Sequence, residues 1–492
     1  MSNETIIFAT LAVPAFGAVM IWLTGSAPNL RESITLITGV VLFALIASLA
    51  PAVMAGERPA AELITMMPGL AIAFRVEPLG LLFGLVASFL WIVTSIYSIG
   101  YMRAHHEVNQ TRFYVFFAIA ILSTIGVAFA ANMLTLFIFY EVLSLSTFPL
   151  VTHSGTPEAK RAGRLYMGIL IGASIGFLLL AIIWTWTITG TLDFTRGGIL
   201  EGKASNTAAA ILLALYVFGI GKTAMMPFHR WLPAAMVAPT PVSALLHAVA
   251  VVKVGVFTVL KVTLYIFGPG YLSRIGASEW LQYVAAATIL IASLVAMTKD
   301  NLKARLAYST ISQLSYIVLG AMLANNLGII GGGMHIAAHA FGKITLFFCA
   351  GAIMVASGKT KVSQMDGLGR VMPFTMAAFF IAALSVIGLP PLGGMWSKWY
   401  LALGALKAGN LFLVGVLMFS SLLNIAYLMP IPIRGFFGKR QADGDPENKT
   451  ATKIREAPLP CLIAIGITAL GGILLFFWPG PVYDLMRLAV QP

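Results

Sequence analysis

Long apolar stretches recur along the whole chain, and short polar segments separate them. A helix needs about 20 apolar residues to cross about 30 Å of hydrocarbon. The stretches that reach this length predict membrane spans at approximately 5–24, 34–54, 77–101, 113–131, 133–152, 165–190, 207–238, 241–267, 280–298, 304–324, 328–356, 373–404, 408–433 and 458–478. The pattern therefore predicts an all-α membrane protein with about 14 transmembrane helices.

Two of these spans are too long to be straight helices. At 1.5 Å per residue, 207–238 and 373–404 would each reach about 48 Å. Proline removes a helical hydrogen-bond donor and clashes with the preceding turn, so breaks are expected at Pro227 and at Pro390. Interrupted helices at corresponding positions of two halves are typical of transporters built from inverted repeats.

The order of the spans predicts four segments. Residues 1–111 form an N-terminal three-helix segment, and 112–268 form a first five-helix repeat. Residues 279–435 form a second, inverted five-helix repeat. Each repeat contains one discontinuous helix, and 436–492 hold a cytoplasmic loop and the last helix.

Composition supports the membrane assignment. Of 492 residues, 59% are hydrophobic and only 10% are charged, whereas a soluble domain carries about 25% charged residues. Mean hydropathy is +0.91. The first apolar stretch lacks the charged start and the cleavage site of a signal peptide, so it is expected to remain as a helix.

The net charge of +13 also needs an explanation. Basic residues gather in short loops on one predicted side, for example in 158–164, 299–305 and 359–370. Such loops are cytoplasmic in membrane proteins, so a multi-pass protein of the cell membrane with both termini outside is predicted. The basic residues form no continuous stripe with aromatic side chains, which disfavours a nucleic-acid partner.

Cysteine usage indicates no redox or structural metal site. Cys349 and Cys461 lie in separate apolar spans and form no CxxC pair. Iron–sulfur or zinc ligation by this chain is therefore not expected, and no cofactor is predicted.

Charged residues inside spans are the strongest functional signal. Each costs about 2.5–3.5 kcal/mol at the centre of a span. Glu141 is the one acidic residue deep within a span, and Lys222 lies beside the first predicted break. We expect Glu141 to tune the charge of Lys222; the alternative is a purely structural ion pair or polar contact between helices.

Two further lysines are candidates for proton exchange. Lys253 lies near the centre of its span, and Lys398 follows the second break. A lysine removed from water gives up its charge more easily, which makes proton exchange possible. The alternative is that the side chain reaches the membrane surface. Lys261, near the outer end of its span, fits this structural interpretation.

Three protonatable residues share one helix face in span 328–356. His335, His339 and Lys343 are spaced i, i+4, i+8 and cover about 12 Å of helix. This spacing favours a proton relay over polar packing or half of a metal site, because no cysteine or second acid is available as a ligand. His247 is a supporting candidate. The neighbouring span carries a polar strip of Ser309, Thr310, Ser312, Gln313 and Ser315.

Several of these residues lie in recognisable strings. They read GKTAMMPFHRWLPAAM (221–236), APTPVSALLHA (238–248), HAFGK (339–343) and GLPPLGGMWSK (388–398). Together, over roughly residues 77–435, they resemble the antiporter-like proton-translocating family. That family includes the large hydrophobic subunits of respiratory complex I, of membrane-bound hydrogenases and of Mrp-type Na⁺/H⁺ antiporters.

The resemblance implies fourteen helices with two inverted five-helix repeats. It matches Glu141 to the family's glutamate, Lys222 to the lysine of the first broken helix and Lys253 to the central lysine. Lys343 and Lys398 match the connecting and terminal positions, the latter being glutamate in some branches. Length and motifs are most similar to the D-type subunits of Mrp antiporters. Arg230 departs from the small or polar residue expected there.

The leading hypothesis is therefore a proton-translocating subunit of a multisubunit Na⁺/H⁺ antiporter, not an enzyme by itself. Its predicted partners are other hydrophobic subunits, H⁺, Na⁺ and the lipid bilayer. The alternative is a pump subunit of a redox-driven complex, an NADH:quinone oxidoreductase or a membrane-bound hydrogenase. A third hypothesis, a scaffold without transport, would leave several buried lysines unexplained.

Overall fold

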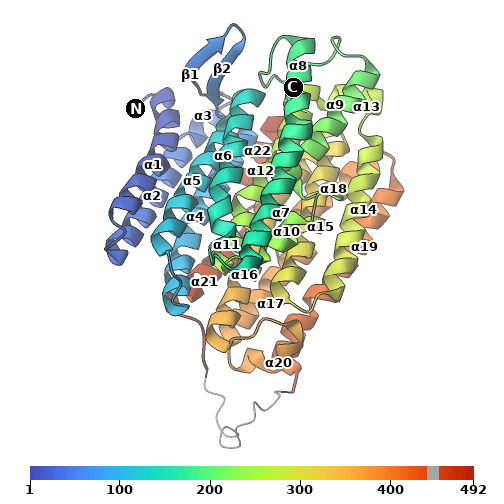
Figure 1. Ribbon diagram of the computed structural model, residues 1–492. Helices are drawn as coiled ribbons and strands as arrows, with labels where there is room; N and C mark the ends of the chain where they lie inside the picture. The colour runs from blue at the N-terminus through green and yellow to red at the C-terminus, as the bar shows by residue number, and fades with distance from the viewer. Residues whose placement is uncertain (440–453, 492) are drawn as a thin grey trace, which may run out of the picture.

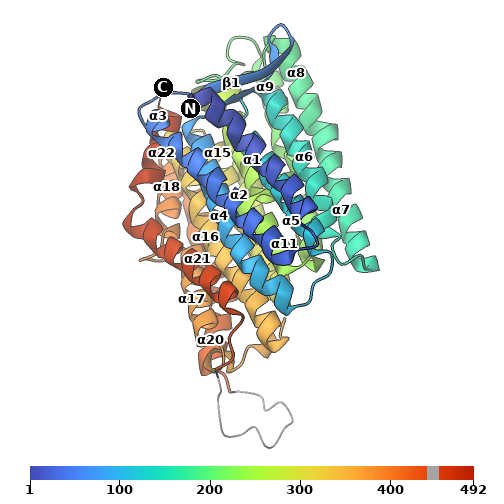
Figure 2. The same ribbon diagram turned by 90° about the vertical axis from the view of Figure 1, so that its left-hand side faces the viewer.

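The computed structural model describes residues 1–439 and 454–491, so residues 440–453 of the predicted cytoplasmic loop lie outside the described chain. Long helices run side by side through the molecule (Figure 1). Both ends of the chain lie at the end of the bundle that also carries a β-hairpin (Figures 1 and 2). We call this end the hairpin face and the opposite end the loop face.

The N-terminal segment combines helices with a hairpin that the apolar pattern does not reveal. Its helices are α1 (Asn3–Leu23), α2 (Pro28–Ser48), the short α3 (Ala50–Met54) and α4 (Pro78–Ala104). Strands β1 (Ala60–Met67) and β2 (Leu70–Arg75) pair antiparallel, with Ala60 opposite Arg75. These residues lie between two predicted spans, and neither strand alternates regularly between buried and exposed side chains.

The region predicted as the first repeat is helical but often interrupted. It contains α5 (Gln110–Phe129), α6 (Met133–Val151), α7 (Pro157–Ala173), η1 (Ser174–Leu178), α8 (Leu179–Thr189), α9 (Asn206–Gly219), η2 (Gly221–Thr223), α10 (Trp231–Ala234), η3 (Ala235–Val237), α11 (Thr240–Ala244), η4 (Leu245–Val249), α12 (Val251–Lys261), η5 (Val262–Phe267) and α13 (Pro269–Ile275). The chain stops being helical after Gly219, and Pro227 lies in the irregular stretch that follows, as expected for a broken span.

The region predicted as the second repeat contains longer helices. They are α14 (Glu279–Thr298), α15 (Leu302–Met322), α16 (Asn326–Ser357), the short η6 (Val362–Gln364) and η7 (Leu368–Arg370), α17 (Pro373–Ile387), α18 (Gly394–Lys407), α19 (Leu411–Leu428) and α20 (Pro430–Phe437). The helix breaks again between α17 and α18, where Pro390 lies. Helices α21 (Leu459–Phe477) and α22 (Gly480–Val490) complete the described chain; α22 was not predicted.

The helix content confirms an all-α membrane protein. Within residues 1–439 and 454–491, ten helices are long and apolar enough to cross a membrane, or eleven if a strongly bent pair counts as one span. Helices α9 and α17 are apolar but shorter, since each ends at a break. The number fourteen and the division into four segments stay predictions.

Two helices that occupy matching places in the predicted repeats begin in the same way. Asn132 precedes α6 and Asn301 precedes α15, and each side chain accepts a hydrogen bond from the backbone N–H three residues on. Such caps satisfy backbone donors that a helix start leaves free. They fix where α6 and α15 enter the bundle, and both helices carry polar groups that line the site described below.

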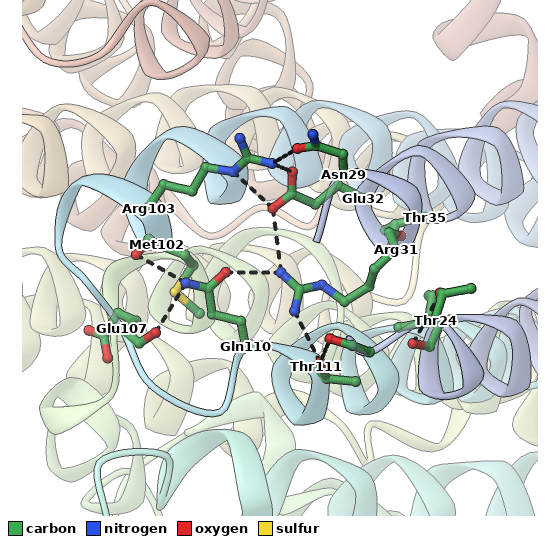
Figure 3. Close-up of polar contacts among 12 residues, drawn as sticks. Thr24, Asn29, Arg31, Glu32, Thr35, Met102, Arg103, Glu107, Gln110 and Thr111 are labelled. Carbon is green, nitrogen blue, oxygen red and sulfur yellow. Dashed lines mark hydrogen bonds and ion pairs between the residues drawn. The ribbon is translucent and has the colours of Figure 1, made fainter. Parts of the chain in front are cut away.

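A polar cluster ties α2 to α4 and α5 near the loop face (Figure 3). Glu32 forms an ion pair with Arg103 and lies 3.5 Å from Arg31. Arg31 donates to Gln110 Oε1 and to Thr111 Oγ1, both at 3.0 Å. The side chains of Arg31 and Glu32 are about 95% buried. Glu32 thus compensates two arginines, one of them withdrawn from solvent.

Replacing Glu32 should destabilise this part of the bundle. Glu32→Ala leaves the buried guanidinium of Arg31 without its carboxylate, and losing one partner of a buried pair costs about 3–5 kcal/mol. A clearly lower melting temperature in detergent is expected. Glu4→Ala, at an exposed site on α1, is the control and should change little. Equal melting of the two variants would contradict this role for Glu32.

Candidate functional site

The three protonatable residues of α16 lie on one face, as predicted, but each meets a different helix. His335 contacts α15 and α18, His339 contacts α12, and Lys343 contacts α15. His335 and His339 have rings 5.7 Å apart between centroids. All three side chains are at least 98% buried. Helix α16 therefore forms the centre of a group of buried polar residues.

Lys253 pairs with His339 across the contact between α12 and α16. Its ammonium Nζ lies 2.6 Å from Nδ1 of the imidazole, and the lysine is fully buried. Such a hydrogen bond needs a proton on one side and a lone pair on the other. The pair can thus hold and exchange a proton away from bulk water.

Lys343 is joined to α19 through α15. Its Nζ donates to Ser309 Oγ at 2.6 Å and to the carbonyl of Leu306 at 3.3 Å. Ser309 in turn lies 2.8 Å from the hydroxyl of Tyr427. Two neutral hydroxyl groups, which can both donate and accept, therefore lead from the lysine to α19.

Asn424 on α19 connects this branch to Lys398 and His335. With its amide oxygen turned toward the two donors, it accepts from Lys398 Nζ and Gln313 Nε2, each at 3.1 Å, and its nitrogen donates to Tyr427 at 2.6 Å. The oxygen of Gln313 lies 3.1 Å from His335 Nε2. Lys343, Lys398 and His335 are therefore members of one continuous hydrogen-bond network.

Lys398 has further contacts that fix its tip. Its Nζ donates to the carbonyl of Ile387, the last residue of α17, at 2.9 Å and to Ser421 at 3.1 Å. It also lies 4.8 Å from the centre of the Tyr316 ring. The carbonyl of Ile387 lacks a helical partner because the helix ends there. The break between α17 and α18 thus supplies part of the lysine's binding site.

Lys222 lies in the first break but does not pair directly with Glu141. Its Nζ donates to the Tyr140 carbonyl at 2.9 Å and to Ser144 Oγ at 2.6 Å, and lies 3.2 Å from the Tyr140 ring centre. One carboxylate oxygen of Glu141 is buried without a hydrogen-bond partner in the described chain. Tyr140 and Ser144 on α6 provide these contacts, so any influence of Glu141 on Lys222 acts through space, and its tuning role stays a prediction.

The two breaks carry their lysines at different positions. Lys222 is in the break itself, ahead of Pro227, whereas Lys398 lies inside α18, beyond Pro390. The rough correspondence expected from sequence therefore does not extend to the lysines. Pro227 and Pro390 are both exposed at the protein surface. The backbone of His247 lies in η4, and its side chain is outside the described structure.

Lys261 does not reach the membrane surface as expected. It is fully buried near the hairpin face, 3.2 Å from a carboxylate oxygen of Glu77, and its Nζ donates to the Ala130 carbonyl at 2.6 Å. Glu77 is the first residue of the predicted span 77–101 and precedes α4 directly, so it was not among the acidic residues deep within a span. The sequence interpretation of Lys261 as structural agrees with this pairing, but the proposed reach toward water was wrong.

Close backbone packing joins the Lys222 break to α12. A Cβ added at Gly255 would lie 2.5 Å from the Lys222 carbonyl carbon and 2.5 Å from the Thr223 nitrogen. Only glycine permits this approach. Gly255 is two residues from Lys253, so it sets the spacing between the two lysines.

Sequence reasoning found the lysines, the histidines and the serine strip but missed the groups that connect them. Asn424 and Tyr427 were not singled out, and neither were Tyr140 and Ser144. Asn424 could have been noticed, since an asparagine within an otherwise apolar span needs a partner. Which partner it has depends on how α15, α18 and α19 pack, which the sequence pattern does not specify.

Linked, buried lysines and histidines inside a helical membrane protein are typical of membrane proteins that move ions. Residues 130–424 match the family model described as NADH:quinone oxidoreductase/Mrp antiporter, transmembrane. The chain belongs to this family.

Relatives in the family come from two kinds of complex. The chain is 34% identical to NADH-quinone oxidoreductase subunit N of Desulforudis audaxviator, over 83% of this chain and 82% of that one. It is 28% identical to the D-type subunit of the Na⁺/H⁺ antiporter of Alkalihalophilus pseudofirmus, over 81% and 79%. It spans about half of the longer NAD(P)H-quinone oxidoreductase chain 5 of Synechocystis, at 32% identity over 67% of this chain and 49% of that one.

Solved structures share the fold. A chain of the Mrp complex from Dietzia sp. superposes with a TM-score of 0.86 at 23% identity, covering 100% of this chain and 97% of that one. A chain of an archaeal membrane-bound sulfane sulfur reductase gives 0.87 at 24% identity, covering 99% and 97%. At these identities the likeness concerns the fold alone.

A side chain at position 255 should displace the backbone that carries Lys222. Gly255→Ala forces the first break away from α12, which moves Lys222 relative to Lys253; overpacking of this kind costs about 1–3 kcal/mol. We expect a lower melting temperature and slower proton transport in reconstituted vesicles. Gly168→Ala on α7, where no atom lies within 4 Å of the added Cβ, is the matched control. Normal stability and transport of Gly255→Ala would show that this contact is not required.

Proposed function

We propose that the chain is a proton-translocating subunit of a multisubunit cation/proton antiporter. The observation that carries this proposal is the continuous network from Lys343 through Ser309, Tyr427 and Asn424 to Lys398. A subunit that only organised its neighbours would have no need for several charged groups in its interior, each costly to insert. Membership of a family that contains Mrp antiporters supports the proposal.

We call Lys222, Lys253, Lys343 and Lys398, together with His335 and His339, the transport row. Protons move along the transport row by exchange between neighbouring groups, one of which is charged and the next neutral. Lys253 and His339 share one hydrogen bond, while Lys343 and Lys398 are both held by neutral oxygens. Like charges repel strongly where water is scarce. Loading one lysine therefore favours release from the next, and hydroxyl and amide groups between them can relay the proton.

We assign to Glu141 and Lys222 the control of proton transfer at one end of the transport row. They lie on α6 and η2 but are not in contact, and Lys222 is held by neutral groups. A change in the position or protonation of Glu141 would alter the field at Lys222 without breaking a bond. We assign His335 and His339 the relay between the lysines, with His247 in a supporting role.

A redox-driven complex is the second candidate. It is favoured by the relative with 34% identity, a subunit of an NADH-quinone oxidoreductase. The membrane chemistry of the lysine row would be the same, with the energy supplied by electron transfer in partner subunits. In either complex the chain is embedded in the cell membrane, and we propose the loop face as cytoplasmic because it carries more basic residues.

Neutralising the central and terminal lysines tests transport directly. Lys253→Met and Lys398→Met each remove a protonatable step, and placing a proton in an apolar gap costs several kcal/mol. Since about 1.4 kcal/mol is tenfold in rate, proton transport should fall at least about a hundredfold in vesicles holding the assembled complex. Lys407→Met, at the exposed end of the same helix α18, should transport normally. Wild-type rates in both buried-lysine variants would leave only the scaffold hypothesis.

The composition of the native complex separates the two candidates. Mass spectrometry of the intact complex, purified through this chain, should find small hydrophobic partner subunits and no electron-transfer cofactor. ΔpH-driven Na⁺ movement in vesicles should accompany that result. Iron–sulfur or flavin subunits in the same preparation would instead favour the redox-driven complex.

A further inference from the structure

The segment that joins α4 to α5 places a carboxylate at the loop face. This segment contains no residue of the transport row. Glu107 lies in this segment and is 85% buried at its side chain. Gln110 Nε2 donates to the Glu107 carbonyl at 3.1 Å, and Arg31 holds the same glutamine from the other side (Figure 3). The cluster around Glu32 therefore fixes the position of the segment.

Glu107 lines an open cavity of about 610 Å³ on this face. Its other lining residues are Pro28, Asn29, Arg103, His106 and Gln110. Most of these residues are polar, so water and protons can reach the carboxylate from the loop face. Arg103 is already paired with Glu32, which leaves Glu107 as the acid of the cavity that can take up a proton.

Behind Glu107 lie two histidines. His105 Nδ1 is 3.1 Å from Oε1, and His153 Nε2 is 3.8 Å from Oε2. The side chain of His153 is completely buried, and neither ring nitrogen makes a hydrogen bond of standard geometry within the described residues. Leaving a buried polar group without a hydrogen bond of standard geometry costs free energy, so the position of this imidazole calls for an explanation. One carboxylate thus bridges an exposed and a buried imidazole.

Helix α6 carries buried hydroxyl groups between His153 and Lys222. His153 follows α6 directly, and Thr147 lies six residues earlier, or about 9 Å along the helix. Thr147 is 2.6 Å from the Tyr166 hydroxyl, and one turn further Ser144 is 2.6 Å from Lys222 Nζ. The hydroxyl groups of Thr147 and Ser144 thus lie between the loop face and the first break.

The charges around the pair leave His153 able to accept a proton. Two cations interact with the pair, and both are held by backbone carbonyls. Arg112 on α5 donates to the His153 carbonyl at 2.7 Å, and Lys303 on α15 donates to the Ala238 carbonyl at 2.5 Å. Burial lowers the pKa of His153, and Arg112 lowers it further, while Glu107 and the backbone at Val108 oppose both. The net lowering of the pKa favours the neutral imidazole, which is the form that can accept a proton.

We propose that Glu107 and His153 form a proton-loading site at the loop face, which collects protons from the cavity and delivers them along α6 toward Lys222. The site binds H⁺ and no other ligand: Glu107 takes a proton from water, His153 accepts it, and the hydroxyl groups of α6 pass it on. This inference rests on the proposed function, because a loading site needs a transport row to feed.

The test measures the pH dependence of proton uptake from the loop face in vesicles that contain the whole assembled complex. Glu107→Gln and His153→Gln remove the loading groups, so more protons are needed for half-maximal uptake. The midpoint should move to lower pH by about one unit, a tenfold loss of proton affinity, while the maximal rate at acidic pH is kept. A merely structural loss would lower the maximal rate without moving the midpoint.

Control variants make either result decisive. Glu107→Asp keeps a carboxylate and should restore the midpoint, whereas Glu158→Gln, an exposed acid on the same face at the start of α7, should leave it unchanged. An unshifted midpoint in Glu107→Gln and His153→Gln, beside a Lys253→Met protein that does not transport, overturns the loading site alone. Normal transport by Lys253→Met overturns the proposed function instead.

Discussion

The structure depends on how a positive charge can be kept inside a protein that is surrounded by hydrocarbon. Four of its buried lysines are held by neutral partners: carbonyls, hydroxyls, an amide and an imidazole. Lys261 is different, because it faces the carboxylate of Glu77. An ammonium beside a carboxylate stays charged, while one beside neutral dipoles is tolerated in either protonation state. The partner, more than burial, therefore distinguishes Lys261 from the lysines to which we assign proton transport.

The helix breaks serve the same requirement. A continuous helix uses its own carbonyl groups, whereas a helix that ends inside the bundle leaves the last ones free. Lys398 uses the carbonyl of Ile387 in this way. At the first break the lysine itself is part of the irregular segment, and α6 supplies the acceptors. Lys222 in the first break and Ile387 at the second are both buried, so the part of each break that contacts or carries a lysine is enclosed by protein.

Much of this could be predicted from the sequence, because insertion into a membrane leaves strong marks. Apolar length revealed the helices, proline revealed both breaks, and the cost of a buried charge pointed to Lys253 and Lys343. The hairpin β1–β2 escaped notice because its strands do not alternate regularly. Pairing was harder: Glu141 and Tyr140 differ by one position on α6, yet only Tyr140 faces Lys222. Such a distinction depends on helix rotation, which hydrophobic length does not determine. The links through Asn424 needed the packing of three helices.

The continuity of helix α16 limits how far its three protonatable residues can move relative to one another. The helix runs unbroken through 32 residues, carries His335, His339 and Lys343 on one face, and packs against the interrupted helix pair α17 and α18. The separations among these three groups cannot change while the helix stays intact. Any rearrangement during a transport cycle must then come from the segments on either side, which approach or withdraw from a stationary array. One continuous helix thus holds the three protonatable residues in a fixed order along its length.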